Sequence, residues 1–281
     1  MTSHEMVVCK VNVAGGTKPS EDKIFDTPGA VIVLDGESHV YDATPSGGWY
    51  AYDLGEVAAK ALTATPDADL RQVLAEAIGE LAVPHGVKAV HSTASVAMVR
   101  HHDGAVDALV LGDCTVVAMA ADGTVVEAVR DDRPARVKAT CPEYEEYRAR
   151  LRTGPGGFDA DHRDLLARLS DHRMRHLNRG EGGYWMAQAV PEAARHALVR
   201  SWSAASLSTI LIMTDGVSAA VEEYGLMSWA DMARVCRTHG PALVLDRIRD
   251  AELDDHQGRR WPREARHDDK ALVSVTLPAA G

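Results

Sequence analysis

The sequence predicts an α+β fold in which antiparallel sheets are layered with helices. Its strands are short and apolar, and most neighbouring strands are separated by turn residues such as Asp-Gly or Gly-Asp. Two longer stretches carry apolar residues at helical spacing. Parallel strands need a long crossover, whereas antiparallel strands can be joined by a tight turn. This order therefore favours antiparallel sheets over a doubly wound parallel sheet.

The N-terminal part is expected to contain two strands and two helices. Residues Met6–Val13 alternate apolar and polar side chains, which is the period of a strand. The wholly apolar run Ala30–Leu34 indicates a buried strand that stops at an Asp-Gly turn. Helices are expected at Tyr52–Leu62 and Pro66–Ala82, and the second has an apolar stripe of helical period.

Four strands in the middle of the chain are expected to form a meander of hairpins. They are short, and turns that contain glycine and aspartate separate them. Such spacing is the signal of tight hairpin connections. The expected strands are Ala94–Val99, Ala105–Leu111, Thr115–Ala120 and Thr124–Ala128.

A polar tract rich in arginine and glutamate follows these strands. It covers Arg130–Gly183 and is the least core-like part of the chain, so we expect an inserted flap at about residues 130–183. Helices are expected within it at Glu143–Leu151 and near Asp161–Leu177. Because no internal repeat or long linker is visible, residues 1–281 are expected to form one domain.

The C-terminal part is expected to add two strands and a helical segment. The strands are Ser206–Met213 and Ala271–Leu277, both dominated by apolar and β-branched residues. The helical segment is Ser228–Arg249, and its first residue is a typical N-cap.

The composition is that of a globular protein with an acidic surface. Of its 281 residues 46% are hydrophobic, and acidic residues outnumber basic ones by 41 to 30. The formal charge of −11 argues against nucleic acid or an anionic membrane as the main partner, because both require basic patches. It does not exclude an anionic substrate, because a bound cation reverses the local field.

The sequence also predicts a cytoplasmic protein. Its four cysteines, Cys9, Cys114, Cys141 and Cys236, form no CxxC pair and are expected to be reduced thiols. The first residues lack the basic start and apolar run of a signal peptide. No apolar stretch approaches the roughly 20 residues that span a bilayer.

Carboxylates stand next to the most apolar strands. Leu34 runs directly into Asp35, Met213 is followed closely by Asp215, and two aspartates open the last strand. Aspartate is a poor strand residue, and a buried carboxylate is costly unless something compensates it. The residues concerned are Glu21, Asp22, Asp35, Asp113, Asp215 and Asp268.

A single Asp-Gly pair is an ordinary turn, and Asp103-Gly104 and Asp122-Gly123 are interpreted that way. The repetition at strand ends indicates more. Carboxylates that meet within about 5 Å repel one another by roughly 3 kcal/mol per pair at an effective dielectric near 20. Only a cation offsets that repulsion. Oxygen ligands without histidine or cysteine select Mg²⁺ or Mn²⁺ over zinc.

The same residues belong to an ordered set of motifs, which resembles that of the metal-dependent, type 2C-like serine/threonine protein phosphatases of bacteria. The resemblance runs from about residue 16 to the end of the chain. It implies a four-layer α-β-β-α sandwich of two antiparallel sheets flanked by helices. The motifs are Lys18-Pro19-Ser20-Glu21-Asp22, VIVLDG at 31–36, Ser92-Thr93-Ala94, LGDC at 111–114, LIMTDG at 211–216 and DDKALVSV at 268–275.

The resemblance also implies metal ligands. Asp35 would bridge two ions, and the Gly36 carbonyl would help to hold one of them. Asp215 and Asp268 would hold the other ion. Asp113 matches the position that supports a third metal in bacterial relatives. The expected cofactors are therefore two or three Mn²⁺ or Mg²⁺ ions.

The implied catalytic groups are less complete. Glu21 and Asp22 would orient waters at the metals. Relatives carry an arginine that grips the substrate phosphate at the position of Thr17, and the neighbouring Lys18 supplies a point charge rather than a bidentate fork. His39 is a candidate to protonate the leaving oxygen, and a metal-bound water is the alternative.

These features predict a phosphomonoester hydrolase in which divalent cations activate water. The favoured substrate is phosphoserine or phosphothreonine in proteins. A phosphatase acting on a small phosphorylated metabolite is one alternative, and a non-catalytic, partner-binding regulator with the same fold is another. The retained carboxylates count against the regulator, because a protein without bound cations has no need of mutually repelling acids.

Two further patterns receive ordinary structural interpretations. His172 and His176 are spaced four residues apart on an expected helix, but the acidic partner of an HExxH zinc motif is missing. Several arginines surround them, so a solvated basic face is favoured, and such a face suits a phosphorylated, acidic partner. The run Gly182-Gly183-Tyr184-Trp185 is a candidate recognition surface, but Trp185 is at least as well explained by packing in the core.

Overall fold

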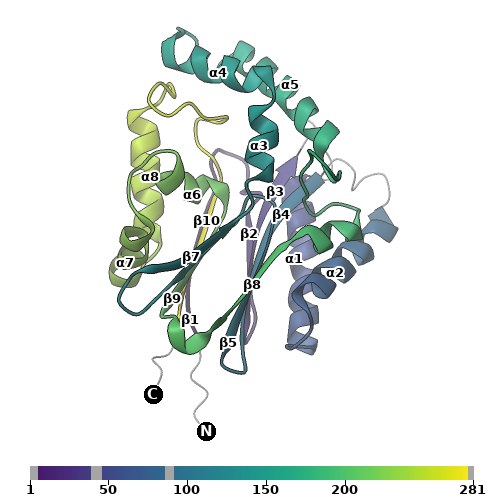
Figure 1. Ribbon diagram of the computed structural model, residues 1–281. Helices are drawn as coiled ribbons and strands as arrows, with labels where there is room; N and C mark the ends of the chain where they lie inside the picture. The colour runs from purple at the N-terminus through teal and green to yellow at the C-terminus, as the bar shows by residue number, and fades with distance from the viewer. Residues whose placement is uncertain (1–5, 39–45, 86–91, 278–281) are drawn as a thin grey trace.

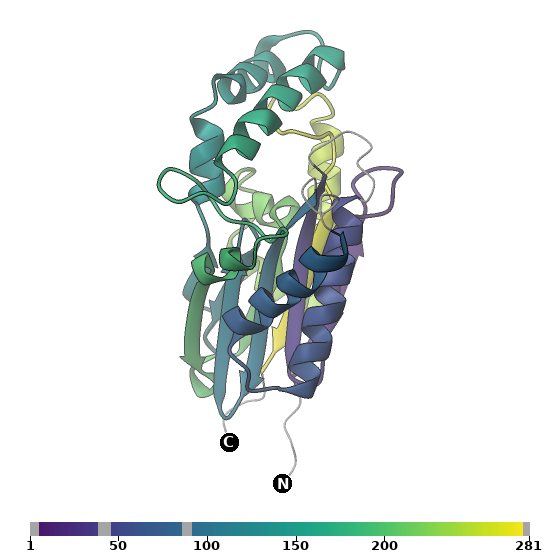
Figure 2. The same ribbon diagram turned by 90° about the vertical axis from the view of Figure 1, so that its right-hand side faces the viewer.

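The protein is a sandwich of two five-stranded antiparallel sheets covered on both outer faces by helices (Figures 1 and 2). This computed structural model describes residues 6–38, 46–85 and 92–277. One sheet has the strand order β1-β10-β9-β6-β7, and the other has the order β2-β3-β4-β5-β8. The predicted α+β, four-layer fold is therefore confirmed.

The strands are β1 (Val7–Val13), β2 (Lys23–Asp26), β3 (Ala30–Ser38), β4 (Ser92–His102), β5 (Ala105–Leu111), β6 (Thr115–Met119), β7 (Val125–Arg130), β8 (Leu198–Ser203), β9 (Thr209–Met213) and β10 (Lys270–Thr276). The α-helices are α1 (Gly47–Ala64), α2 (Leu70–His85), α3 (Arg133–Ala139), α4 (Pro142–Thr153), α5 (Ala160–His176), α6 (Asp215–Glu222), α7 (Trp229–His239) and α8 (Ala242–Asp254). Two short 3₁₀ helices are η2 (Pro191–His196) and η3 (Ala204–Ser206).

Strand β3 shows how the apolar sequence produces the layers. Val31 and Val33 belong to the core between the two sheets, whereas Ile32 and Leu34 belong to the core beneath helices α1 and α2. Successive side chains of a strand point to opposite faces, so a strand covered on both faces must be apolar throughout. A third core lies between the other sheet and helices α6, α7 and α8.

Strand β3 is longer than the sequence predicted. It does not end at Asp35-Gly36 but continues to Ser38, because these residues pair with the first part of β4. Asp35 lies opposite Ser95, and Gly36 lies opposite Ala94. The expected turn is therefore wrong, and Asp35 is a strand residue held in register by the sheet.

The predicted hairpin around Asp113 is also wrong. Strand β5 belongs to one sheet and β6 to the other, so the short connection between them crosses from sheet to sheet. Gly112 has a φ of 82°, a conformation that favours glycine, and a Cβ atom there would collide with Ser95. The crossing carries Asp113 to the end of the sandwich.

Several short elements carry no sequence signal strong enough to be predicted. Strand β2 has only four residues, β8 is a half-exposed edge strand, and α6 has only eight residues. The helical segment after Ser228 is two helices, because Gly240, with a φ of 86°, ends α7 before Pro241. The predicted N-cap is confirmed: Ser228 and Asp231 form a capping box.

Helices α3, α4 and α5 stand above one end of the sandwich, and we call them the flap helices (Figures 1 and 2). Helices α4 and α5 share a small apolar core that includes Tyr147, Leu151 and Leu169. Within the described residues, every helix is too short or too polar to span a bilayer. All four cysteines are free thiols.

Candidate active site

The antiparallel register brings strand ends from both sheets to the end of the sandwich beneath the flap helices. Strand β9 ends at Met213, which lies opposite Thr115 at the start of β6 and Leu272 near the start of β10. In the other sheet, β2 begins at Lys23 opposite Leu34 of β3. Residues immediately beyond these positions therefore meet, although they are far apart in the sequence.

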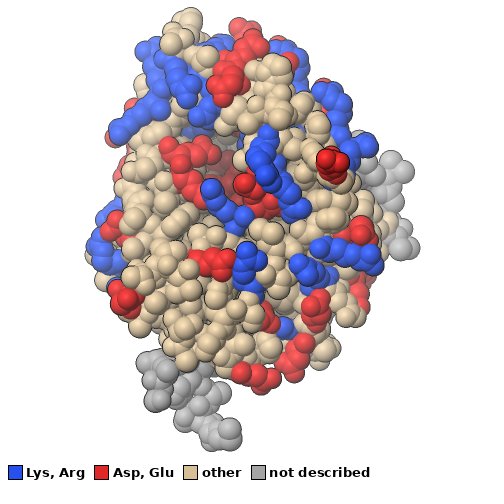
Figure 3. Space-filling model, in the orientation of Figure 1, with Lys and Arg blue, Asp and Glu red and all other residues tan. Residues whose placement is uncertain are grey.

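A pocket of about 360 Å³ lies between this end of the sandwich and the flap helices. Figure 3 shows acidic side chains gathered in a hollow beneath the flap helices, with basic side chains around the edge of the hollow. The predicted site residues that line the pocket are Glu21, Asp22, Asp35, Gly36, Asp113, Asp215 and Asp268.

Two predicted residues are not placed in the pocket. Lys18 is exposed and does not belong to the described residues that line it. His39 lies outside the described residues. The roles assigned to both remain predictions.

Asp22 is the most deeply buried carboxylate of the pocket, with 1% of its surface exposed. The Thr214 hydroxyl donates a hydrogen bond of 2.8 Å to Asp22 Oδ2, and Thr214 in turn accepts one of 3.0 Å from the Ala271 amide. Burial raises the pKa of Asp22 well above its usual range, and the charges of Asp268 and Asp269 add to this, against the lowering effect of Thr214.

The other strand-end carboxylates interact in the same way. Desolvation raises the pKa of Asp35 well above its usual range, with contributions from Asp22, Asp215 and Asp113. Desolvation and Asp113 raise the pKa of Asp215 to about 7, and desolvation and Asp215 raise that of Asp268. Ionising all of these groups together is costly unless positive charge enters the pocket. The donors are oxygens alone, so the residues present fit hard divalent cations.

Two carboxylates have positions that hydrogen bonds fix directly. Ser95 donates to Asp113 Oδ1 at 2.5 Å and accepts from the Asp113 amide at 3.1 Å. Asp269, which the sequence did not single out, accepts from the Gly15 amide at 2.7 Å and the Glu21 amide at 2.6 Å. Asp269 thus ties the N-terminal segment to the start of β10. Its one sequence signal is its place in the Asp268-Asp269 pair.

The flap helices add two cations to the pocket that the sequence did not predict. Lys138 Nζ lies 2.6 Å from a Glu264 oxygen, and Arg173 binds Glu37 through both terminal nitrogens, at 2.6 and 2.8 Å. Burial alone would raise the pKa of Glu264, but Lys138 and Arg173 lower it to about 2. Lys138 and Arg173 lie in the polar tract Arg130–Gly183, and only the tertiary structure shows that they line the pocket.

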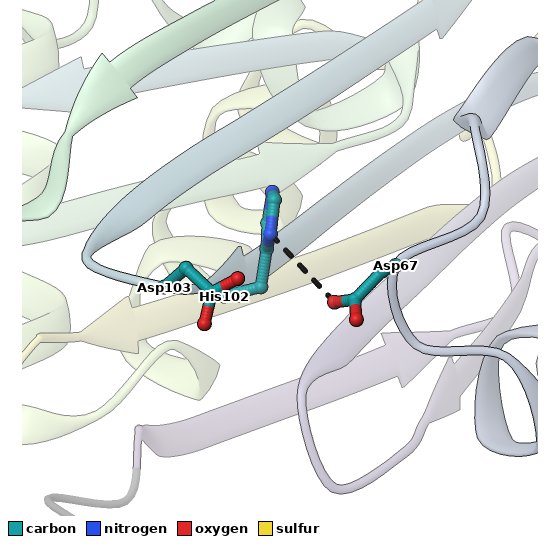
Figure 4. Close-up of side chains that lie close together, drawn as sticks. All are labelled: Asp67, His102 and Asp103. Atoms are coloured by element: carbon teal, nitrogen blue, oxygen red, sulfur yellow. Dashed lines mark ion pairs between the residues drawn. The ribbon is translucent and has the colours of Figure 1, made fainter.

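The described residues also include a second group of possible metal ligands, outside the pocket. Donor atoms of Asp67, His102 and Asp103 all lie within 4.8 Å of one another (Figure 4). His102 is seven residues along β4 from Ser95, or about 23 Å at roughly 3.3 Å per strand residue, so the cluster is remote from the pocket. His102 Nε2 lies 2.7 Å from Asp107 Oδ2, and Asp67 and Asp103 are both exposed. These residues are therefore interpreted as a surface ion-pair network.

The carboxylate-lined pocket at the end of the two-sheet sandwich fits hard divalent cations, which in enzymes activate water for hydrolysis. Comparison with protein families matches residues 52–253 to the family described as protein phosphatase 2C. This match covers well over half of the chain, and the chain therefore belongs to the protein phosphatase 2C family. The predicted family and class of activity, a metal-dependent protein phosphatase, are confirmed.

Solved structures of bacterial phosphatases are similar to this fold. The serine/threonine phosphatase PstP/Ppp of Mycobacterium tuberculosis is 12% identical with a TM-score of 0.57, over 97% of this chain and 99% of that chain. PppA of Pseudomonas aeruginosa is 16% identical with a TM-score of 0.56, over 98% of each chain.

A structure of the PstP catalytic domain in complex with two manganese ions is 12% identical with a TM-score of 0.55, over 97% of this chain and 98% of that chain. At these identities the similarities show the common fold. The search of curated proteins finds no match to the chain.

Proposed function

We propose that this protein hydrolyses phosphoserine and phosphothreonine in proteins with Mn²⁺ or Mg²⁺ as cofactor. The observation that carries the proposal is the meeting of carboxylates from both sheets in one pocket, where desolvation and mutual repulsion raise their pKa values. The family match supports the phosphatase activity. A neighbour of the same fold, PstP, is described with two manganese ions.

The proposal assigns the ions to Asp35, the Gly36 carbonyl, Asp215 and Asp268, with Asp113 available to a third. When bound, such ions act as Lewis acids and lower the pKa of water. Asp35 and Gly36 lie within β3, and the other carboxylates lie within two residues of the end of a paired strand. The donors are therefore positioned before any ion binds, which reduces the reorganisation that binding requires.

Other residues keep these donors in place. Thr214 holds the Asp22 carboxylate, Ser95 holds Asp113, and Asp269 holds the backbone of Glu21. Hydrogen bonds to ligating groups fix their orientation and tune their basicity. We infer that Glu21 and Asp22, which line the pocket, would orient waters at the metal ions, as the sequence predicted.

The proposal also keeps three predictions that concern the whole chain. Residues 1–281 form one phosphatase domain with a flap insertion at about 130–183, and the protein works in the cytoplasm, where its four free thiols stay reduced. His39 remains the candidate general acid. Lys18, exposed outside the pocket, is the weakest candidate for a phosphate grip.

One panel of substrates tests the proposal. Hydrolysis of p-nitrophenyl phosphate, a phosphothreonine peptide and several phosphorylated metabolites is measured with Mn²⁺ and again with excess EDTA. We expect activity only with Mn²⁺, and a higher kcat/KM for the peptide than for any metabolite. A strong preference for one metabolite would replace the protein substrate by a small molecule, and inactivity toward every compound would contradict phosphatase function.

A further inference from the structure

The pocket raises a problem of charge. A phosphate monoester is an anion, yet the described residues that line the pocket include many carboxylates. The N-terminal segment carries Thr17 where a phosphate-binding arginine was expected, and Lys18 is exposed outside the pocket. Cations that bind the phosphoryl group must therefore come from another part of the chain, in addition to any metal ions.

Four cations line the pocket in the described part of the chain: Lys138, Arg148, Arg173 and Arg263. Arg263 is fully engaged, because it bonds to Asp255 and to four backbone carbonyls. Arg148 donates to the Pro262 carbonyl at 3.3 Å and lies over an aromatic ring, with its guanidinium carbon 5.1 Å from the centroid. Arg148 and Arg263 therefore use their guanidinium groups in contacts within the protein.

Lys138 and Arg173 line the same pocket as the strand-end carboxylates, and each is paired with a glutamate at the pocket wall. Lys138 lies on α3 and Arg173 on α5, so two different flap helices direct positive charge at the carboxylate site.

Arg173 also has hydrogen-bonding capacity that the protein does not use. Its side chain is 8% exposed, and its guanidinium presents five N–H donors in all. Glu37 accepts from its two terminal nitrogens, but Arg173 Nε has no hydrogen-bond partner. Unsatisfied buried donors are costly, and an anion held at this wall would engage the fork.

We propose that Lys138 and Arg173 bind the phosphoryl oxygens of the substrate, in place of the arginine that is missing at Thr17. This inference rests on the proposed phosphatase function. Glu264 and Glu37 act as positioning residues, because each holds one of the two cations at the pocket wall. The phosphate grip is thereby located on the flap helices, whereas the metal ligands belong to the sandwich.

A purely structural role for the two cations would have a different signature. If Lys138 and Arg173 only neutralised Glu264 and Glu37, their replacement would lower the melting temperature without changing the affinity for phosphate. The test must therefore measure binding of an anion and folding separately. Inorganic phosphate, the product of the reaction, is a suitable probe because it offers the same oxygens without a leaving group.

The experiment measures the inhibition constant of inorganic phosphate, and KM and kcat for p-nitrophenyl phosphate, with the full chain and saturating Mn²⁺. The variants are Lys138→Met and Arg173→Lys, the second retaining the charge that Glu37 requires. Matched controls are Arg136→Met on α3 and Arg168→Met on α5, both exposed. We expect each test variant to raise the inhibition constant and KM at least tenfold, as for a charge-assisted hydrogen bond of about 1.5 kcal/mol or more.

The controls are expected to stay within twofold of the parent chain, and Lys138→Arg is expected to restore most of the affinity. Unchanged inhibition constants and KM in both test variants, with an active parent chain, would overturn this inference and leave the phosphatase function standing. A parent chain that hydrolyses no p-nitrophenyl phosphate with Mn²⁺ would overturn both. Circular dichroism of each variant establishes that a change in affinity does not come from unfolding.

Discussion

The end of the sandwich that carries the pocket carboxylates Asp22, Asp35, Asp113, Asp215 and Asp268, which we call the rim, faces the flap helices across one pocket. The rim and the flap helices are built differently. The rim supplies carboxylates on backbone that the sheets hold in register, as for Asp35 opposite Ser95. The flap supplies cations at the ends of long side chains, on helices with a small core of their own. The comparison indicates that the carboxylates, which we propose as metal ligands, are fixed by strand pairing, whereas the positions of the cations depend on how the flap helices pack.

The largest expected effect follows from removing one rim carboxylate. Asp215→Asn keeps the shape of the side chain but removes its charge and one anionic ligand. We expect kcat for p-nitrophenyl phosphate to fall at least about a hundredfold, in line with losses caused by disturbing metal sites. Asp122→Asn, at an exposed turn, is the control and should retain full activity. An undiminished rate in Asp215→Asn would contradict a catalytic role for the pocket carboxylates.

The second prediction concerns pH in the absence of metal. The folded-state pKa of Asp215 is raised to about 7, above the unfolded value of about 3.9. A carboxyl group shifted in this direction favours the folded state at low pH, and its effect is lost as pH rises through the folded pKa. The melting temperature in EDTA should therefore fall between pH 5 and pH 8.

Mn²⁺ should abolish most of that fall, because a cation compensates the ionised carboxylates. Asp215→Asn should flatten the pH profile measured in EDTA, because one of the shifted groups is gone. Differential scanning fluorimetry at several pH values provides the measurement. A metal-free protein whose melting temperature rises steadily from pH 5 to pH 8 would show that the rim carboxylates do not repel one another.

A smaller effect is expected from the support beneath the rim. Thr214→Val removes the hydroxyl that donates to Asp22 and accepts from the Ala271 amide. Leaving buried polar groups unpaired costs about 1–3 kcal/mol, so the free energy of unfolding in urea should fall by that amount. Thr214→Ser should recover most of the loss. Thr238→Val on the exposed surface of α7 is the control. An equal decrease in the free energy of unfolding in this control would show that the buried hydrogen bonds of Thr214 do not cause the effect.

The smallest effect is expected on the outer surface of the flap. Arg168 is exposed and lies 3.2 Å from Glu143, and such surface pairs contribute about 0–1 kcal/mol. Arg168→Met should change the free energy of unfolding by less than about 0.5 kcal/mol. KM for a phosphothreonine peptide should also stay constant. A KM that rises severalfold would instead assign the exposed basic face of α5 to protein-substrate binding.

The same contrast explains what could be predicted from the sequence. Periodicity and apolar runs predicted most strands and helices. The order of the motifs predicted that Asp35, Asp215 and Asp268 lie in one site, and all three line the pocket. Local signals failed where tertiary pairing decides. Gly36 looked like a turn residue but pairs with Ala94, and the connection at Asp113 crosses between sheets.

The cations were harder to predict than the carboxylates. Lys138 and Arg173 belong to a tract in which many basic residues look alike, and only the packing of α3 and α5 shows which of them face the pocket. Lys18 was chosen because it is next to Thr17, yet it is exposed and does not line the pocket. Sequence spacing identifies residues fixed by strand register better than residues placed by long side chains on packed helices.

Direct titration with Mn²⁺ tests the central claim, namely that acids distant in the sequence form one divalent-cation site. Isothermal titration calorimetry of the metal-free chain should show at least two Mn²⁺ ions per chain, and Asp215→Asn should lose at least one of them with its fold intact. His102→Ala, at the remote cluster, should bind the same number as the parent chain. Binding that is absent from the parent chain, or unchanged in Asp215→Asn, would contradict the account.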